Sequence, residues 1–349
     1  MKKILIYLVS FVLICFIVPS LLTKRTKTAA NQDVNAKNIE QSEYNKQEVK
    51  NQESSQQEKS QEYQYKKYGT INLLHKCTGQ VEQVNLDDYL CNVVSAEMPA
   101  TYETEALKAQ AIVARTYTVY KILNKKHDNA DICDDSKCCQ AWISKEDRLN
   151  RWEESQRNSN WDKICKSVND TKGQIITYNN QPIDAFFHSN SGGVTEVPVN
   201  VWGGTGYPYL QSVQTSGEEA YTQYASEVVF TQEELLNKLK EKYNDISIDF
   251  ANDDDIKILE FTESTRVKTI KFGNHNLSGV EARTLLGLKS TNFEISKENN
   301  NIKFSVKGYG HGVGMSQTGA DSMAKQGNNA ENIIKHFYTG VEVKDLNNV

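Results

Sequence analysis

The chain has 349 residues, enough for one large domain or two of ordinary size. Its 40 basic and 45 acidic side chains nearly cancel and leave a net charge of −5. Such a balance gives no overall positive field, so we set nucleic-acid binding aside.

The N-terminal residues differ from the rest of the chain. Lys2 and Lys3 precede an uncharged run over residues 4–22, and these 19 residues are mostly Ile, Leu, Val and Phe. A helix of this length nearly spans a hydrocarbon core of about 30 Å. We therefore predict a transmembrane helix over residues 1–23. A cleaved signal peptide is the alternative, although Thr28-Ala29-Ala30 is a weak cleavage site. Basic residues on both sides leave the orientation undecided.

Residues 24–66 are rich in Gln, Asn, Lys, Glu and Ser and hold almost no large aliphatic side chains. Such a segment cannot offset its ordering entropy by burial, which predicts a disordered polar spacer. A partner-binding tail is the alternative. Residues 67–349 have globular patterns and form the predicted folded domain.

Within this domain the patterns mix helices with hairpins and show no repeat, which favours an α+β fold with a buried helical core. In chain order we expect short strands over 70–74 and 80–85, a helix from residue 86 that Pro99 stops, a helix over 103–123, and a hairpin of strands 174–178 and 183–187 around Asn179-Asn180. Further on we expect a helix over 232–243 and a last helix within 316–338.

Glu97 is the first candidate catalytic residue. It closes the first predicted helix in the string VSAEMP, where its neighbours are largely apolar. Partial desolvation and the negative end of the helix dipole both favour a protonated carboxyl. A carboxylic acid that stays neutral near pH 7 can act as a general acid that protonates a glycosidic oxygen. An exposed glutamate at a helix end is the alternative.

The second predicted helix, ALKAQAIVARTYTVY, is rich in small and apolar residues and should be buried. Arg115 lies inside it, and a buried arginine needs a carboxylate or other acceptors. A short loop joins the two helices, so they should pack as neighbours. Arg115 could orient Glu97 or hold substrate, or it could form a purely structural ion pair.

Four potential metal ligands lie between residues 127 and 139. His127, Cys133, Cys138 and Cys139 suit local coordination by a ring nitrogen and thiolates, although their spacing matches no standard zinc finger. We predict a structural zinc ion on His127, Cys133 and Cys139. Water, Cys138 or another group would fill the remaining position. A disulfide within this loop is the alternative.

Two glycine-containing segments offer hydrogen-bonding groups. FFHSNSGGVTE, over residues 186–196, presents His188, Ser189 and Ser191 for sugar hydroxyls, unless it is a structural turn. GYGHGVGMSQTGA, over residues 308–320, presents His311 among four glycines. His311 could contact substrate, support the Glu97 region or be a buried core histidine.

These strings, together with VWGG at 201–204 and YPYLQSV at 207–213, occur in the order typical of one family. The chain resembles the stage II sporulation protein D family over about 225 residues. The combination of GHGVGMSQ with FFHSNSGG is highly specific, and the anchor and spacer are similar to those of the sporulation member. Family members often carry a Cys-Gln pair at the position of Cys139-Gln140, which adds Gln140 to the supporting residues.

The resemblance implies a lytic transglycosylase that acts on septal peptidoglycan during forespore engulfment, with Glu97 as the catalytic acid/base. Such enzymes cleave the bond between N-acetylmuramic acid (MurNAc) and N-acetylglucosamine (GlcNAc) and leave a 1,6-anhydro end. The resemblance further implies glycan strands denuded of stem peptides, a sporulation amidase (stage II protein P) that supplies them, and a membrane scaffold (stage II protein M). It also implies a single-pass protein of the mother-cell engulfing membrane, with its catalytic domain outside the cytoplasm.

The spacing of carboxylates agrees with an elimination. Hydrolytic glycosidases usually need two carboxylates about 5–9.5 Å apart. The nearest acidic residues upstream on the helix of Glu97 are Asp87 and Asp88, at roughly 14 Å for about 1.5 Å per residue. A carboxylate from elsewhere in the fold stays open. Two other functions also stay open, a non-catalytic glycan-binding enhancer of a wall amidase and a zinc-dependent cell-wall hydrolase.

Overall fold

The computed structural model describes residues 67–348. The predicted transmembrane helix and spacer lie outside the described residues. Among the helices of residues 67–348, none is long and apolar enough to cross a membrane.

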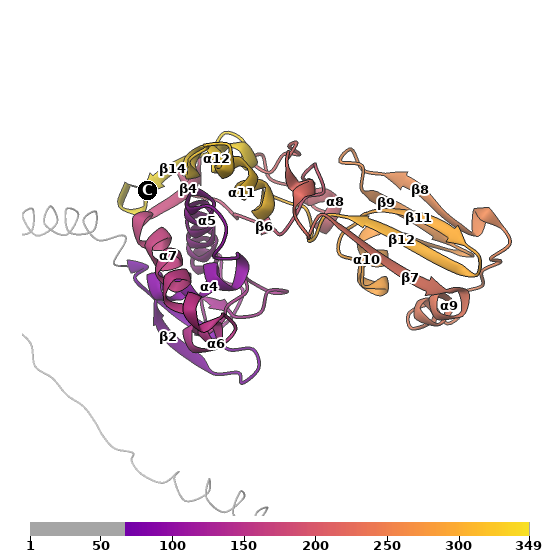
Figure 1. Ribbon diagram of the computed structural model, residues 1–349, viewed down its shortest axis with the longest axis horizontal. Helices are drawn as coiled ribbons and strands as arrows, with labels where there is room; N and C mark the ends of the chain where they lie inside the picture. The colour runs from indigo at the N-terminus through magenta and orange to yellow at the C-terminus, as the bar shows by residue number, and fades with distance from the viewer. Residues whose placement is uncertain (1–66, 349) are drawn as a thin grey trace, which may run out of the picture. The chain divides into compact units, whose positions relative to one another are not determined.

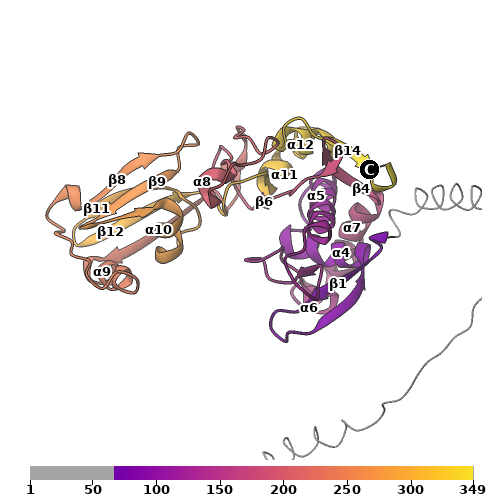
Figure 2. The same cartoon turned by 180° about the vertical axis from the view of Figure 1, so that it is seen from behind.

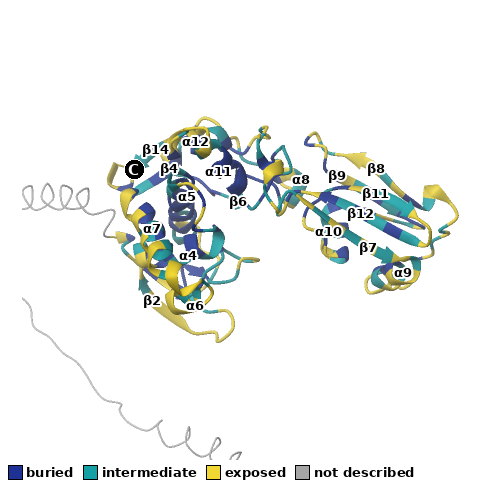
Figure 3. Ribbon diagram, viewed as in Figure 1, coloured by how far each residue is buried: buried dark blue, intermediate teal, exposed yellow. Residues whose placement is uncertain are grey.

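Helices form the first of two hydrophobic cores. Their bounds are α4 Leu86–Glu97, α5 Thr104–Leu123, α6 Lys145–Asn150, α7 Arg157–Asp170, α8 Pro198–Trp202, α11 Gln317–Lys325 and α12 Ala330–Phe337. α5 packs against α4, α7, α11 and α12 (Figure 1). It is buried along most of its length, as its small and apolar residues predict (Figure 3).

Local chemistry sets the ends of α4, which carries Glu97. The Asn85 side chain accepts hydrogen bonds from the backbone N–H groups of Asp87 and Asp88 and caps the first turn. At the other end Met98 is already extended, because the residue before a proline avoids the helical region. Glu97 is therefore the last helical residue, as the sequence predicts.

Three small sheets accompany the first core. The strands are β1 Thr70–Leu74, β2 Val81–Asn85, β3 Ile132–Cys133, β4 Gln174–Tyr178, β5 Gln181–Pro182, β6 Phe187–His188, β13 Met315–Ser316 and β14 Glu342–Asp345. Their orders are β2-β1-β3, β14-β4-β5 and β13-β6. The β1–β3 and β6–β13 pairs are parallel, and the others are antiparallel.

The second core is built from two three-stranded antiparallel sheets and two helices. The elements are β7 Ala225–Thr231, α9 Gln232–Lys240, β8 Ile256–Phe261, β9 Val267–Phe272, β10 His275–Ser278, α10 Gly279–Leu286, β11 Asn292–Glu298 and β12 Asn301–Lys307. The sheet orders are β10-β9-β8 and β11-β12-β7, and α9 packs on β7 and β12 (Figure 2).

The predicted hairpin around Asn179-Asn180 is only partly correct. Both asparagines have positive φ, 50° and 59°, as a two-residue type I′ turn requires, and β4 has its predicted bounds. The returning strand is wrong, because β5 covers only Gln181–Pro182 and the chain then leaves the sheet. Phe187–His188 pairs instead with β13, so tertiary pairing overrides the local pattern.

The predicted last helix within 316–338 is two helices, α11 and α12, separated by a turn at 326–329. Gly327 adopts a φ of 88° there, and the Asn329 side chain caps α12. The described part is thus a mixed α+β structure with a helical core and several small sheets, most of them antiparallel.

Candidate active site

Glu97 lies at the C-terminal end of α4 with its carboxylate held at both oxygens. The backbone N–H of Ala141 donates to Oε1 at 2.7 Å, and Nε2 of Gln317 donates to Oε2 at 3.3 Å. Burial raises the pKa of Glu97 above its usual 4.5, while the two donors partly oppose that rise. The sequence expectation of a carboxyl with a raised pKa is met.

Glu97 lines a cavity of about 510 Å³. The lining comes from segments far apart in the chain: Ala96, Glu97, Tyr117, Ser136, Cys139, Ala141, Phe186, Phe187, His188, Ser189, Arg283, Tyr309, Gly310, His311 and Gln317. Among these described lining residues, Glu97 is the one carboxylate. The cavity therefore offers a single acidic group, surrounded by aromatic rings, histidines and one arginine.

The two glycine-containing segments predicted from the sequence meet beside Glu97. β6 of the first pairs with β13 of the second, and Asn190 bridges to Tyr309. A β-carbon on Gly314 would lie 1.9 Å from the carbonyl oxygen of Phe186, so only glycine fits this approach. This contact brings His188 and His311 to one wall, with their ring centroids 5.7 Å apart.

Both histidines are neutral near pH 7. Burial lowers the pKa of His188 to about 4, and its Nδ1 donates to the carbonyl oxygen of Val313 at 3.1 Å. Burial also lowers the pKa of His311 well below 6.5, as does the positive charge of Arg283. Nδ1 of His311 accepts from the backbone N–H of Val313 at 3.1 Å, which leaves its proton on Nε2.

Ser189 lines the cavity, but Ser191 does not. Ser191 is fully buried and donates to the carboxylate of Glu218 through both its backbone N–H and its hydroxyl. Glu218 also accepts from the hydroxyls of Thr215, Ser316 and Thr318. Ser191 thus helps to fix both glycine-containing segments around a buried carboxylate that sequence reasoning missed.

Gln140 is buried and contacts the site indirectly, through its neighbour Ala141. Its Nε2 donates to the hydroxyls of Tyr89 at 2.9 Å and Thr118 at 3.0 Å, and its side chain is buried. These contacts hold the backbone at the next residue, Ala141, whose N–H reaches Glu97. Gln140 is a positioning residue for that hydrogen bond.

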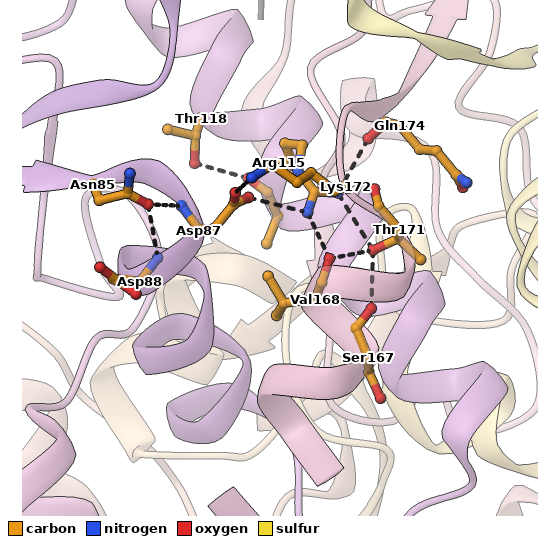
Figure 4. A network of polar contacts seen from close by, with 11 residues as sticks. Asn85, Asp87, Asp88, Arg115, Thr118, Ser167, Val168, Thr171, Lys172 and Gln174 are labelled. Atoms are coloured by element: carbon orange, nitrogen blue, oxygen red, sulfur yellow. Dashed lines mark hydrogen bonds and ion pairs between the residues drawn. The ribbon is translucent and has the colours of Figure 1, made fainter. Parts of the chain in front are cut away.

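Arg115 lies at the opposite end of α4 from Glu97. Its guanidinium donates to the carbonyl oxygens of Val168 and Thr171 and lies 3.7 Å from Oδ1 of Asp87 (Figure 4). Asp87 and Glu97 are roughly 15 Å apart along the helix at about 1.5 Å per residue. Of the three roles left open by the sequence, the structure shows the structural ion pair, which ties α5 to α4 and the end of α7.

The predicted metal ligands come together. The donor atoms of His127, Cys133, Cys138 and Cys139 all lie within 4.8 Å of one another, and Nε2 of His127 is 3.5 Å from Sγ of Cys139. Donors about 2.0–2.3 Å from a tetrahedral ion are roughly 3.5–4 Å apart, so this group can hold one metal ion. The six cysteines of the described residues are all free thiols, and Cys138 joins the three predicted ligands.

Several residues that line the cavity were not among the site residues predicted from the sequence. Gln317 lies in the second glycine-containing segment, and its position in the string GMSQ is the signal that could have drawn attention to it. Arg283 carries no such signal, because it lies on α10 in the second core, far in sequence from the other lining residues.

Comparison with known proteins shows the family of the chain. A family model described as stage II sporulation protein matches residues 75–178. The chain is 37% identical to stage II sporulation protein D of Bacillus subtilis (strain 168) over 268 residues, 76% of each chain. The chain belongs to the stage II sporulation protein D family. The corresponding protein of Bacillus amyloliquefaciens is 35% identical over 269 residues, again 76% of each chain.

A further relative carries a different name. An amidase enhancer of Bacillus subtilis (strain 168) is 30% identical over 300 residues, which cover 72% of this chain and 39% of the relative. The resemblance inferred from the motifs is thus confirmed at the level of the family.

Proposed function

We propose that this chain is a lytic transglycosylase that cleaves the MurNAc–GlcNAc bond of denuded septal peptidoglycan during forespore engulfment. The observation that carries the proposal is the cavity with one carboxylate, Glu97, whose pKa is raised. A hydrolase of the usual two-carboxylate kind needs a second acid about 5–9.5 Å away. No other Asp or Glu lines this cavity among the described residues.

One carboxyl group suffices for the elimination. Protonated Glu97 gives its proton to the glycosidic oxygen, and the bond between that oxygen and C1 of MurNAc breaks. The C6 hydroxyl oxygen of the same sugar then forms a bond to C1, and its proton returns to the Glu97 carboxylate. The donors Ala141 and Gln317 stabilise the ionised form between the two steps. No water is consumed, and the product carries a 1,6-anhydro end.

The walls of the cavity suit a sugar. The Ser189 hydroxyl offers hydrogen bonds, and the neutral histidines add no charge. Trp202 is 51% exposed and packs on Phe186 and His311, with ring centroids 4.6 and 5.1 Å away. An exposed aromatic ring at a cavity margin provides a flat apolar surface for a pyranose.

The metal group fits a structural zinc ion. Four protein donors, one nitrogen and three sulfurs, complete a tetrahedral shell and leave no open position for water. A zinc-dependent hydrolase would need such a position, so this alternative is disfavoured. His127, Cys133, Cys138 and Cys139 would fix the loop that ends at Ala141.

The proposal includes the cellular setting. A transmembrane helix over residues 1–23 and a polar spacer over 24–66 would hold the catalytic domain, residues 67–349, outside the cytoplasm in the mother-cell engulfing membrane. An amidase of the stage II protein P type would supply denuded strands, and a stage II protein M type scaffold would hold the assembly.

Product analysis tests the chemistry. Full-length wild type and Glu97→Gln are incubated with denuded glycan strands, and the products are identified by mass spectrometry. Wild type should release 1,6-anhydro ends, and Glu97→Gln should lower the rate by about 10²- to 10⁴-fold. Gln326→Leu, on the exposed end of α11, is the control. Reducing ends from wild type would rule out elimination.

The amidase-enhancer relative favours a second candidate, a non-catalytic glycan-binding protein that stimulates an amidase. Under it the wild type would bind denuded strands and leave them intact, and Glu97→Gln would stimulate an amidase as well as wild type does. The same two proteins therefore decide between the candidates.

A further inference from the structure

Arg283 brings a positive charge to the cavity of Glu97. It lies in the last turn of α10, a helix of the second core, and its side chain is half-buried. Burial lowers the pKa of the guanidinium, and the other group that acts on it is Tyr309. No carboxylate among the described residues pairs with Arg283. A half-buried arginine is ordinarily paired, so this one is available to a ligand.

The positive charge of Arg283 acts on other side chains that line the cavity. It contributes to the lowered pKa values of both His188 and His311. Glu97, the one lining carboxylate, has a raised pKa and forms no ion pair with this arginine among the described residues. The cavity therefore holds a cation that forms no ion pair among the described residues, which suits a substrate with an anionic group close to the bond that breaks.

The proposed substrate has one sugar with such a group. GlcNAc is neutral, whereas MurNAc carries a 3-O-lactyl substituent whose carboxyl is either free or joined to a stem peptide as an amide. Resting on the proposed function, we propose that Arg283 binds the free lactyl carboxylate of the MurNAc residue at the cleavage site and so selects strands that have lost their stem peptides.

The chemistry of the pair explains the selection. A guanidinium presents two parallel N–H donors that match a carboxylate, and such charge-assisted bonds are roughly twice as strong as neutral ones. An amide at the same position carries no charge and leaves the arginine unpaired in a half-buried setting. A peptide-bearing strand therefore loses this interaction as well as adding bulk.

Matched substrates test the proposal without the bulk of a peptide. Two tetrasaccharides of alternating GlcNAc and MurNAc are compared, one with free lactyl carboxylates and one with lactyl methylamides. Cleavage (kcat/KM) and calorimetric binding are measured for full-length wild type, Arg283→Met and Arg283→Lys. Lys289→Met is the control, because Lys289 is an exposed cation that stacks on Tyr309 at 4.4 Å without lining the cavity.

Wild type should prefer the free acid over the methylamide by about 10- to 100-fold, and Arg283→Met should remove that preference by weakening the acid alone. Arg283→Lys should keep part of it, and Lys289→Met should keep all of it. An equal loss on both substrates, or no loss on either, overturns the role of Arg283. If wild type cleaves neither substrate, the proposed function fails, while the acid-over-amide ratio in binding still decides the role of Arg283.

Discussion

At the scale of single residues, the protonation state of Glu97 governs the proposed reaction. Burial raises its pKa, and hydrogen bonds from Ala141 and Gln317 lower it. The effect of burial is the larger one, so the pKa is raised overall. The backbone donor at Ala141 is beyond the reach of side-chain substitution. Gln317 is the adjustable part of this balance.

We predict that Gln317→Leu shifts the alkaline limb of the pH–rate profile to higher pH. Glu97 must be protonated to act as the acid, so kcat/KM falls as pH rises through its pKa. Loss of the Gln317 donor destabilises the carboxylate and raises that pKa further. The limb is measured on denuded glycan for wild type, Gln317→Leu and the exposed control Gln326→Leu. A limb that stays in place, or moves to lower pH, contradicts this role.

The sequence predicted the surroundings of some site residues and not of others, and the difference has a physical reason. Glu97, His188 and His311 lie in short segments whose apolar or glycine-rich neighbours already define their surroundings. The partners of Arg115 and Ser191 come from elsewhere in the chain, and a buried polar side chain alone does not say which acceptor it will find. The same holds for Arg283, whose place at the cavity follows from tertiary structure alone.

At the scale of elements, the loop between α5 and α6 connects the metal ligands to the site. Cys133 is anchored by the parallel pairing of β3 with β1. Cys139 lines the cavity, and Ala141, two residues later, donates to Glu97. An ion held by this loop would therefore fix the position of a hydrogen bond to the catalytic acid without taking part in the chemistry.

We predict that the purified full-length protein contains zinc and that its removal lowers the rate of glycan cleavage by about 10- to 100-fold without unfolding the helical core. Metal content is measured by elemental mass spectrometry and the fold by circular dichroism. Cys139→Ser should lose zinc, and Cys77→Ser, an exposed thiol outside the group, should keep it. Zinc retained by Cys139→Ser, or full activity of the metal-free protein, contradicts the prediction.

The elements that were predicted correctly are those whose signals are local. The ends of α4 follow from Asn85 and Pro99, and α5 from an unbroken run of small and apolar residues. The errors fall where pairing partners are distant. Residues 183–186 have a strand-like composition, yet the strand ends before them, because β5 pairs with β4 only at Gln181 and Pro182.

At the scale of the whole molecule, Glu218 ties together segments that are far apart in sequence. It is fully buried and accepts hydrogen bonds from Ser191, Gly193 and Thr215 on one side and from Ser316 and Thr318 on the other. The same two segments carry His188, Ser189, His311 and Gln317 to the cavity. A carboxylate outside the cavity therefore fixes the arrangement of one of its walls.

Arg266 adds a link to the second core. It follows β8 and is buried, and its guanidinium donates to the carbonyl oxygen of Ser191 at 2.6 Å. A β-carbon on Gly312 would lie 2.6 Å from the same guanidinium, so the arginine packs directly on the second glycine-containing segment. Glu218 and Arg266 thus approach both segments, and neither was apparent from the sequence, where each lies in a polar stretch beside other charged residues.

We predict that Glu218→Gln lowers the free energy of unfolding at pH 7 by about 3 kcal/mol. Burial alone would raise the pKa of Glu218, but the hydrogen bonds from Ser191 and Ser316 lower it to about 2. A depressed pKa contributes stability that is fully present above the unfolded value of 4.5 and is lost as pH falls towards 2. The stability difference between wild type and Glu218→Gln should therefore be largest near neutral pH and shrink between pH 4.5 and 2.

Denaturant unfolding of the full-length proteins across this pH range measures the difference. Glu219→Gln is the matched control, because its carboxylate is an exposed neighbour of the same chemistry. Glu218→Gln should also cleave denuded glycan more slowly, since the donor Gln317 follows Ser316 directly and Glu97 itself is unchanged. Equal stability of the two variants at neutral pH would mean that the hydrogen bonds around Glu218 do not hold the two segments together, and the wall of the cavity would then need another support.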